Sequence, residues 1–184
     1  MEAVLLKIRD FVDQAHGSQK RKYSDERYIV HPVRVMNICR TYDGRLPILA
    51  AALLHDVLED TRVKENEILD FLLGLMPSGD AAWTIAMVVE LTDVYIKPDY
   101  PNLNRRRRKQ LELDRIIQTS PEAQTIKYAD ILDNCSEIVA NDRDFAPRLL
   151  NECRAILLHS VKGNPDLHQV AIEKIDTELA RIAR

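Results

Sequence analysis

The sequence predicts an all-α protein with a single domain over residues 1–184, and two observations lead to this prediction. Apolar residues recur at intervals of three and four along most of the chain, which is the spacing of amphipathic helices. Glycine is scarce, with 5 residues, and aromatic residues make up only 5%, which disfavours a strand-rich sandwich or barrel and a glycine-rich phosphate loop. No repeat, low-complexity tract or linker divides the chain, and its length suffices for one buried core.

The first half of the chain predicts five helices. A stripe of apolar residues from Val4 to Val12 marks the first, and the polar, aperiodic residues 17–27 are expected to form a loop. Pro32 fits the first turn of a helix, and Thr61 is the expected cap of a short one. The expected helical ranges are residues 1–15, 32–42, 46–59, 64–74 and 79–91.

The second half predicts four helices after an irregular connection. Pro98 and Pro101 make residues 94–104 unsuitable for a helix. Ser120 followed by Pro121 is a helix-start signature, with the serine as cap and the proline in the first turn. The expected ranges are 105–118, 121–141, 147–161 and 165–184, so that the functional core spans about 16–140 and the C-terminal helices about 147–184.

Composition excludes several classes of protein. The net charge of −3 argues against bulk binding of nucleic acid. The N-terminal residues are interrupted by charges, unlike a secretory signal, and the longest apolar run, Leu46–Leu54, is too short to span a bilayer. The 3 cysteines form no CxxC pair, so neither a disulfide framework nor a cysteine-rich zinc site is expected. We therefore expect a cytoplasmic protein that binds neither nucleic acid nor membrane.

The segment LLHDVLEDT, residues 53–61, carries the strongest chemical signal. It ends an apolar helix that is expected to be buried, and it contains His55, Asp56, Glu59 and Asp60. At about 100° per residue, all four side chains lie on one side of that helix. Carboxylates so close together repel one another, and burial strengthens the repulsion. A divalent metal bound by His55 and Asp56 is the economical explanation, and a fraying helix end with solvated acids is the alternative.

Two further residues are candidate ligands. His31 follows an apolar run at the entry to a helix, and Asp130 begins a polar stripe with Asn134 on an otherwise apolar helix. Taken alone, a histidine in this position is more often a hydrogen-bonded core residue than a ligand. Together with the His-Asp pair at positions 55 and 56, they make a set of two histidines and two aspartates. Such mixed nitrogen and oxygen ligands suit Mn²⁺, Fe²⁺, Co²⁺ or Zn²⁺ with open positions for water.

These motifs, in this order, resemble the HD-domain phosphohydrolases, and within them the hydrolase domain of the RelA/SpoT-homologue family. The resemblance rests on AHG at 15–17 with Gln19 and Arg21, YIVHPV at 28–33, AALLHDVLEDT at 51–61, Leu91-Thr92, and IKYAD at 126–130 with Asn134. It implies an HD-type helical bundle and a stand-alone small alarmone hydrolase. The chain ends where larger members begin a synthetase domain, so synthesis is not expected.

The resemblance also implies the reaction and the site. The family removes the 3′-pyrophosphate from guanosine tetra- and pentaphosphate, which leaves GDP or GTP and pyrophosphate. The metal, usually Mn²⁺, acidifies a bound water, and two acids orient that water and handle its proton. The implied residues are the metal ligands His31, His55, Asp56 and Asp130 and the catalytic acids Glu59 and Asp60.

Substrate contacts follow from the same resemblance. Arg21 and Lys22 would contact the purine, and Asn134 the nucleoside, with guanosine and adenosine alarmones both left open. A run of basic residues, 105–109, fits either a solvated helix face or a contact to the 5′-phosphates. Arg105 and Arg108 share a face of the predicted helix and are the candidates for that contact.

Two other functions remain open at this point. One is an HD-class phosphatase acting on another nucleotide, such as NADPH, and the other is a catalytically silent nucleotide-binding module. Release of inorganic phosphate rather than pyrophosphate would distinguish the first alternative. The sequence leaves open whether the protein forms a homo-oligomer.

Overall fold

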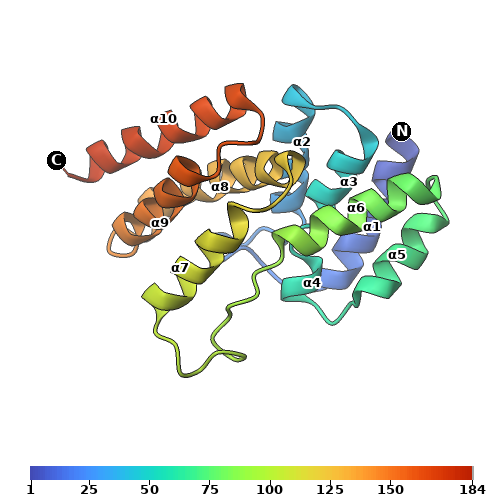
Figure 1. Cartoon of the computed structure of the whole chain (residues 1–184), viewed down its shortest axis with the longest axis horizontal. Helices are drawn as coiled ribbons and strands as arrows, with labels where there is room; N and C mark the ends of the chain where they lie inside the picture. Colours follow the sequence, from blue (N-terminus) through green and yellow to red (C-terminus); the bar gives the residue numbers. More distant parts are fainter. Residues whose placement is uncertain (184) are drawn as a thin grey trace. The chain divides into compact units, whose positions relative to one another are not determined.

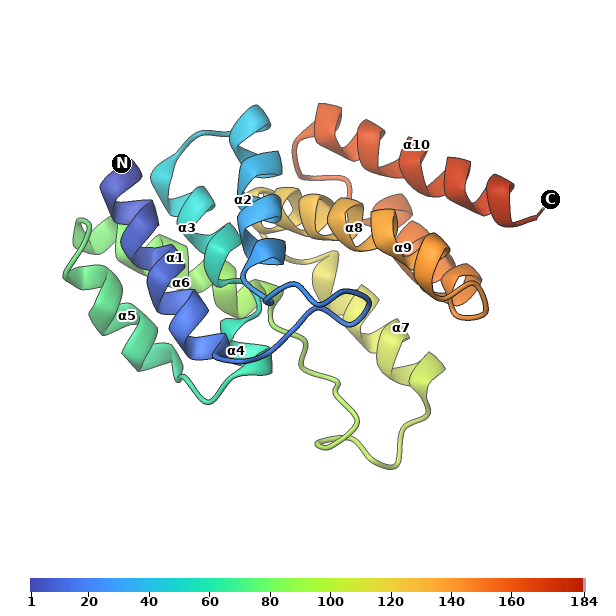
Figure 2. The same cartoon turned by 180° about the vertical axis from the view of Figure 1, so that it is seen from behind.

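The computed structural model describes residues 1–183, which fold into ten helices and their connecting loops (Figure 1 and Figure 2). An isolated antiparallel bridge joins Lys20 to Arg27 in this described part of the chain. The predicted all-α fold is confirmed. The helices fall into two compact units, unit 1 with residues 1–92 and unit 2 with residues 93–184. In residues 1–183, no helix combines the length and the apolar character needed to cross a membrane.

Unit 1 is built around an apolar central helix. Its helices are α1 (Glu2–His16), α2 (Val30–Tyr42), α3 (Leu46–Leu54), α4 (Val57–Asp60), α5 (Glu65–Leu73) and α6 (Ser78–Leu91). Every residue of α3 after Leu46 is buried, because α1, α2 and α6 pack around it. The helix α5 packs on α6, and Phe71 stacks on Phe11 of α1 with 4.3 Å between ring centroids. The polar residues that follow α3 therefore start from a fixed point in the core.

Unit 2 contains four helices. They are α7 (Arg105–Ile116), α8 (Pro121–Asn141), α9 (Ala146–His159) and α10 (Pro165–Ile182). The helix α10 packs against α8 and α9, which run beside it in Figure 2, and α7 packs against α9. Regularly spaced apolar residues make these contacts, among them Leu150, Leu157, Leu167, Ala171 and Ile175.

Most helix ends agree with the sequence prediction to within two residues. The Ser120 hydroxyl accepts a hydrogen bond from the Ala123 N–H, so the predicted cap of α8 is confirmed. The predicted end of the last helix, Arg184, lies outside the described residues. The predicted cap at Thr61 is wrong: its hydroxyl donates to the Val57 carbonyl at the end of α4, and α5 begins after Lys64 instead.

The largest difference concerns the helix predicted over residues 46–59. It stops at Leu54, and α4 begins at Val57 after a break at His55 and Asp56. The His55 Nδ1 lies 2.9 Å from the Ala52 carbonyl oxygen. In a continuing α-helix that carbonyl accepts the N–H of Asp56, so the histidine side chain competes for it. The helical-wheel argument for residues 55–60 therefore does not apply as it stands, because these residues do not share one helix.

Candidate metal centre

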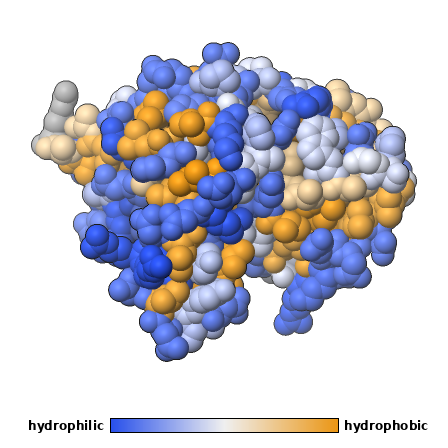
Figure 3. All heavy atoms as spheres, in the orientation of Figure 1, coloured by the Kyte–Doolittle hydropathy of each residue, from blue (hydrophilic) through white to orange (hydrophobic). Residues whose placement is uncertain are grey.

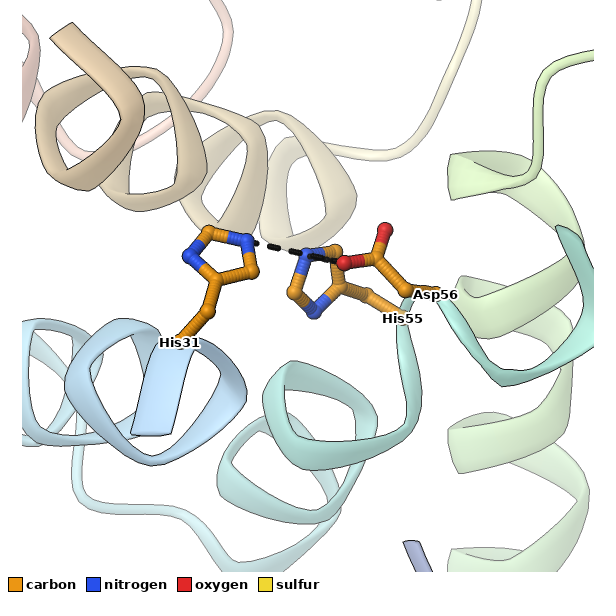
Figure 4. Close-up of side chains that lie close together, drawn as sticks. All are labelled: His31, His55 and Asp56. Carbon is orange, nitrogen blue, oxygen red and sulfur yellow. Dashed lines mark ion pairs between the residues drawn. The ribbon is translucent and has the colours of Figure 1, made fainter. Parts of the chain in front are cut away.

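The break between α3 and α4 brings three candidate ligands together in unit 1. Asp56 Oδ2 lies 3.0 Å from His55 Nε2 and 3.5 Å from His31 Nε2. One ligand atom from each of the three residues lies within 4.8 Å of the others. Figure 4 shows the three side chains converging, with His31 coming from α2 and the other two from the segment after α3. Both histidines are buried, and Asp56 is partly exposed.

The hydrogen bond of His55 determines which of its nitrogens can bind a metal. A carbonyl oxygen can only accept, so the contact to Ala52 places the proton on Nδ1. The Nε2 then carries a lone pair and faces the Asp56 carboxylate at 3.0 Å. Two electron-rich atoms in this position are stabilised by a cation between them. Imidazole nitrogen and carboxylate oxygen are ligands of first-row divalent metals, so the donor set fits such an ion.

Tyr28 holds the carboxylate of this centre. Its hydroxyl donates to Asp56 Oδ2 at 2.6 Å, and its ring meets the edge of the His31 ring. A hydrogen-bond donor fixed against a metal ligand in this way orients that ligand and tunes its basicity. Tyr28 is only part of a motif in the sequence-based prediction, which does not include this role. Its position three residues before His31 was the available signal.

The two predicted catalytic acids lie on the short helix α4. Glu59 and Asp60 follow Asp56 within one turn, and both are exposed to solvent. Asp60 Oδ2 accepts a hydrogen bond of 3.1 Å from the side-chain amide of Gln19. Exposed carboxylates beside a metal centre can exchange protons with water.

The predicted purine contacts lie in the loop between α1 and α2. The Arg21 guanidinium lies 5.9 Å from the centroid of the Tyr28 ring, the same ring whose hydroxyl binds Asp56. The Lys22 ammonium lies over the Tyr23 ring at 4.7 Å. Arg21 therefore lies near a residue that contacts a candidate metal ligand, whereas Lys22 lies over the ring of Tyr23, which is a different residue.

Asp130 and Asn134 belong to unit 2, where they contact each other. Asp130 is buried in α8, and its two carboxylate oxygens accept from the Asn134 amide at 2.6 Å and from Lys127 at 2.9 Å. Asn134 thus orients Asp130 as well as being a candidate nucleoside contact. These contacts are local in sequence, at i−3 and i+4, so α8 alone determines them.

A cleft of about 680 Å³ lies between α7 and α9 in unit 2. Leu113, Ile116, Ala155 and Ile156 supply apolar lining. The charged lining consists of five basic residues, Arg105, Arg106, Lys109, Lys127 and Arg148, and three acidic residues, Asp93, Glu112 and Glu152. Figure 3 shows hydrophilic residues with hydrophobic residues between them over this part of the molecule.

Of the two arginines predicted to contact the 5′-phosphates, only Arg105 lines this cleft. Arg105 lines it and pairs with Glu152 at 2.6 Å, a hydrogen bond that raises the pKa of the arginine. The Arg108 guanidinium donates instead to the Leu103 carbonyl. Arg106, which belongs to the same basic run, and Arg148, which was not predicted from the sequence, also line the cleft and form no ion pair within residues 1–183. Arg148 lies on α9, far in sequence from the basic run, so no local pattern could have revealed it.

Comparison with known proteins identifies the fold family. The sequence model of the HD domain family matches residues 28–135. The chain belongs to the HD domain family. The matched part of this HD domain contains every predicted metal ligand and both predicted acids, and it includes residues of both units.

Within the HD domain family, this chain is similar to a particular group of named hydrolases. It is 33% identical over 139 residues to the human protein named guanosine-3′,5′-bis(diphosphate) 3′-pyrophosphohydrolase MESH1. The matched stretch makes up 74% of this chain and 70% of the human protein. A protein of Vibrio cholerae named guanosine-3′,5′-bis(diphosphate) 3′-pyrophosphohydrolase is 32% identical over 172 residues, or 91% of this chain and 22% of its own. The resemblance to this hydrolase group is confirmed.

A solved structure shares the fold of this HD domain. It is described as a metazoan ortholog of SpoT that hydrolyzes ppGpp and plays a role in starvation responses. The superposition has a TM-score of 0.71 and covers 98% of this chain and 93% of the other, at 22% sequence identity. The predicted HD-type helical bundle is therefore confirmed.

Proposed function

We propose that this protein hydrolyses the 3′-pyrophosphate of alarmone nucleotides such as ppGpp and pppGpp. The products are GDP or GTP and pyrophosphate. The observation that carries the proposal is the convergence of His31, His55 and Asp56 in a chain whose relatives are named for this activity. The acids Glu59 and Asp60 follow on the next helix, as this chemistry requires.

The proposed metal is Mn²⁺, held by His31, His55 and Asp56 with Asp130 as the fourth ligand that the resemblance implies. The donor set supports the first three, because His55 presents the lone pair of Nε2 and Asp56 an oriented oxygen. When bound, the metal acidifies a water molecule and polarises a phosphoryl oxygen. Fe²⁺, Co²⁺ and Zn²⁺ take the same ligands, so a metal-binding measurement has to decide between them.

The residues of the chain supply positioning and proton transfer. Glu59 and Asp60 orient the attacking water and accept its proton. The oxygen of that water forms a bond to the phosphorus attached to the 3′ oxygen, and the bond from this phosphorus to the 3′ oxygen breaks. The leaving 3′ oxygen takes up a proton. General acid–base help of this kind contributes about two to four orders of magnitude in rate.

The proposed substrate contacts are Arg21 and Lys22 at the purine and Asn134 at the nucleoside. For the phosphates we propose the basic side chains of the unit 2 cleft, since arginine binds phosphate oxygens in pairs. Arg105 and Arg108 remain predictions for this role. Arg106, from the same basic run, and Arg148 are further candidates, because they line the cleft without an acidic partner in residues 1–183.

The organisation of the chain and its location are proposals too. We propose that residues 1–184 act as one HD-type domain, because the family match includes residues of both compact units. A single cooperative unfolding transition of the whole chain would support this. A cytoplasmic location agrees with a nucleotide substrate, and analytical ultracentrifugation would decide whether the protein is a homo-oligomer.

Separation of the reaction products by anion exchange tests the proposal. The purified protein with Mn²⁺ is offered ppGpp, its adenosine counterpart and NADPH in parallel, with Asp56→Ala as control. We expect pyrophosphate and a nucleoside 5′-diphosphate from an alarmone, and none from the control. Inorganic phosphate from NADPH alone would reassign the protein as a phosphatase. Tight nucleotide binding without turnover of any substrate would favour the binding module.

A further inference from the structure

The loop between α1 and α2 presents polar side chains to the acid on α4. The Gln19 amide nitrogen donates to Asp60 Oδ2 at 3.1 Å, and the Gln19 amide oxygen lies 2.8 Å from His16 Nδ1. The two contacts determine how the amide is turned. Its oxygen cannot face a carboxylate, so its nitrogen does, and the oxygen must accept from His16.

These contacts assign a single tautomer to His16. Because Nδ1 donates to Gln19, the proton is on Nδ1, and Nε2 carries a lone pair. Nε2 is buried and has no hydrogen-bond partner within residues 1–183. A buried nitrogen without a hydrogen-bond partner lowers the stability of the fold. A phenylalanine ring would fill the same space and would bury no such nitrogen. What a histidine adds here is the donor that orients Gln19.

The backbone fixes Gln19 in place. Its N–H donates to the His16 carbonyl at 3.0 Å, and its carbonyl accepts from the Tyr28 N–H at 2.9 Å. The adjacent antiparallel bridge joins Lys20 to Arg27. Gly17 permits this return of the chain, because its φ of 57° lies in the left-handed region that favours glycine. Gln19 is therefore a rigid donor rather than a side chain on a free loop.

The same aromatic ring connects this loop to the metal centre. The His16 ring stacks on Tyr28 with 4.5 Å between centroids, and the Tyr28 hydroxyl donates to Asp56. Asp60 is exposed at the end of a four-residue helix, and no other side chain within residues 1–183 hydrogen-bonds to it. Gln19 is thus the contact that restricts the rotamers of the Asp60 carboxylate.

We propose that Gln19 is a positioning residue for Asp60 and that His16 sets the orientation of the Gln19 amide. The inference rests on the proposed function, in which Asp60 handles a proton of the attacking water. With Oδ2 held by Gln19, Oδ1 is left for that water. Loss of the hydrogen bond lowers the fraction of Asp60 in the productive rotamer, so kcat falls while metal affinity and KM stay the same.

Kinetics of single and double variants test the inference. We expect Gln19→Leu and His16→Phe each to lower kcat about three- to tenfold, the effect of losing one hydrogen bond. In an Asp60→Asn background, Gln19→Leu should cost nothing more, because its target carboxylate is gone. Lys20→Met, in the same loop, is the matched control and should leave kcat unchanged. Wild-type kcat in Gln19→Leu, or an equal loss in the Asp60→Asn background, would overturn the inference.

Nuclear magnetic resonance tests the same contacts without turnover. The ¹⁵N signals of His16 should show a protonated Nδ1, and the Gln19 side-chain amide signals should shift in Asp60→Asn and in His16→Phe but not in Lys20→Met. An amide signal that neither change moves would overturn the inference, even if the wild type hydrolyses alarmones. A wild type without alarmone hydrolysis would refute the proposed function, and these spectra would still decide whether Gln19 holds Asp60.

Discussion

Asp56 combines two roles at the scale of single residues. Its carboxylate supplies the oxygen ligand between two histidines, and it accepts a hydrogen bond from the Tyr28 hydroxyl. Asp56→Ala removes the charge that a cation needs between those imidazoles, so we expect metal and activity to be lost together. Metal content by mass spectrometry of the purified variant, beside its rate on ppGpp, measures both. Activity that survives without bound metal would contradict the metal centre.

Glu59 should separate metal binding from turnover. Glu59→Gln keeps the shape of the side chain and removes its capacity to take a proton. We expect normal metal content and a kcat lowered by about two orders of magnitude or more. A titration of Mn²⁺ into the metal-free variant, followed by steady-state kinetics, checks both parts. A kcat near that of the wild type would show that Glu59 does not handle the proton.

Tyr28 should act on the metal through Asp56. Tyr28→Phe keeps the ring that stacks on His16 and removes the hydroxyl that donates at 2.6 Å. Loss of a hydrogen-bond donor to a metal ligand weakens metal affinity about tenfold or more. Calorimetric titration with Mn²⁺ measures this, with Tyr42→Phe as a control outside the site. Equal affinity of Tyr28→Phe and wild type would refute the role of the hydroxyl.

At the scale of elements, the turn between α9 and α10 depends on one glycine. A Cβ on Gly163 would lie 2.5 Å from the Tyr128 ring, whose hydroxyl donates to the Ser160 carbonyl. We expect Gly163→Ala to lower the free energy of unfolding by about 1–3 kcal/mol through overpacking. Gly44→Ala is the matched control, because no atom lies within 4 Å of its added Cβ. Denaturant unfolding of both variants measures the difference, and equal stability would contradict the close approach.

Basic residues on α7 and α8 make the free energy of unfolding depend on pH through Asp93. Burial alone would raise the pKa of this carboxyl, but the charges of Lys127, Lys109 and Arg115 together hold the pKa below its ordinary value. A lowered folded pKa means that the stabilisation is complete above the unfolded pKa of about 4 and is lost as pH falls through the folded value. We expect Asp93→Asn to be less stable than wild type at pH 7. The gap should close at low pH in denaturant titrations, and a gap constant with pH would contradict the ion-pair account.

The elements show how far sequence reasoning reaches. The helices could be located from the spacing of apolar residues and from proline or serine at helix starts, because both are local properties of the chain. The break at His55 was not predicted, since periodicity does not report a side chain that competes for the Ala52 carbonyl. The metal ligands could be named because their motifs are short. The contact from Gln19 to Asp60 joins positions 41 residues apart, and no local pattern encodes it.

At the scale of the whole molecule, the proposed function means that the protein cleaves the bond between the 3′ oxygen and its phosphorus. The motifs, the three converging ligands and the named relatives all support this reaction. Both products follow from which bond breaks, and a phosphatase acting on the same nucleotide would break a different one. The destination of the oxygen from water therefore distinguishes the two.

Hydrolysis of ppGpp in ¹⁸O-labelled water, with mass spectrometry of the products, tests the claim most directly. We expect pyrophosphate that carries the heavy oxygen and GDP that carries none. Heavy oxygen in inorganic phosphate would mean that a terminal phosphate is removed, and heavy oxygen in the nucleoside diphosphate would mean that a carbon–oxygen bond breaks. Either result would contradict hydrolysis of the 3′-pyrophosphate at this site.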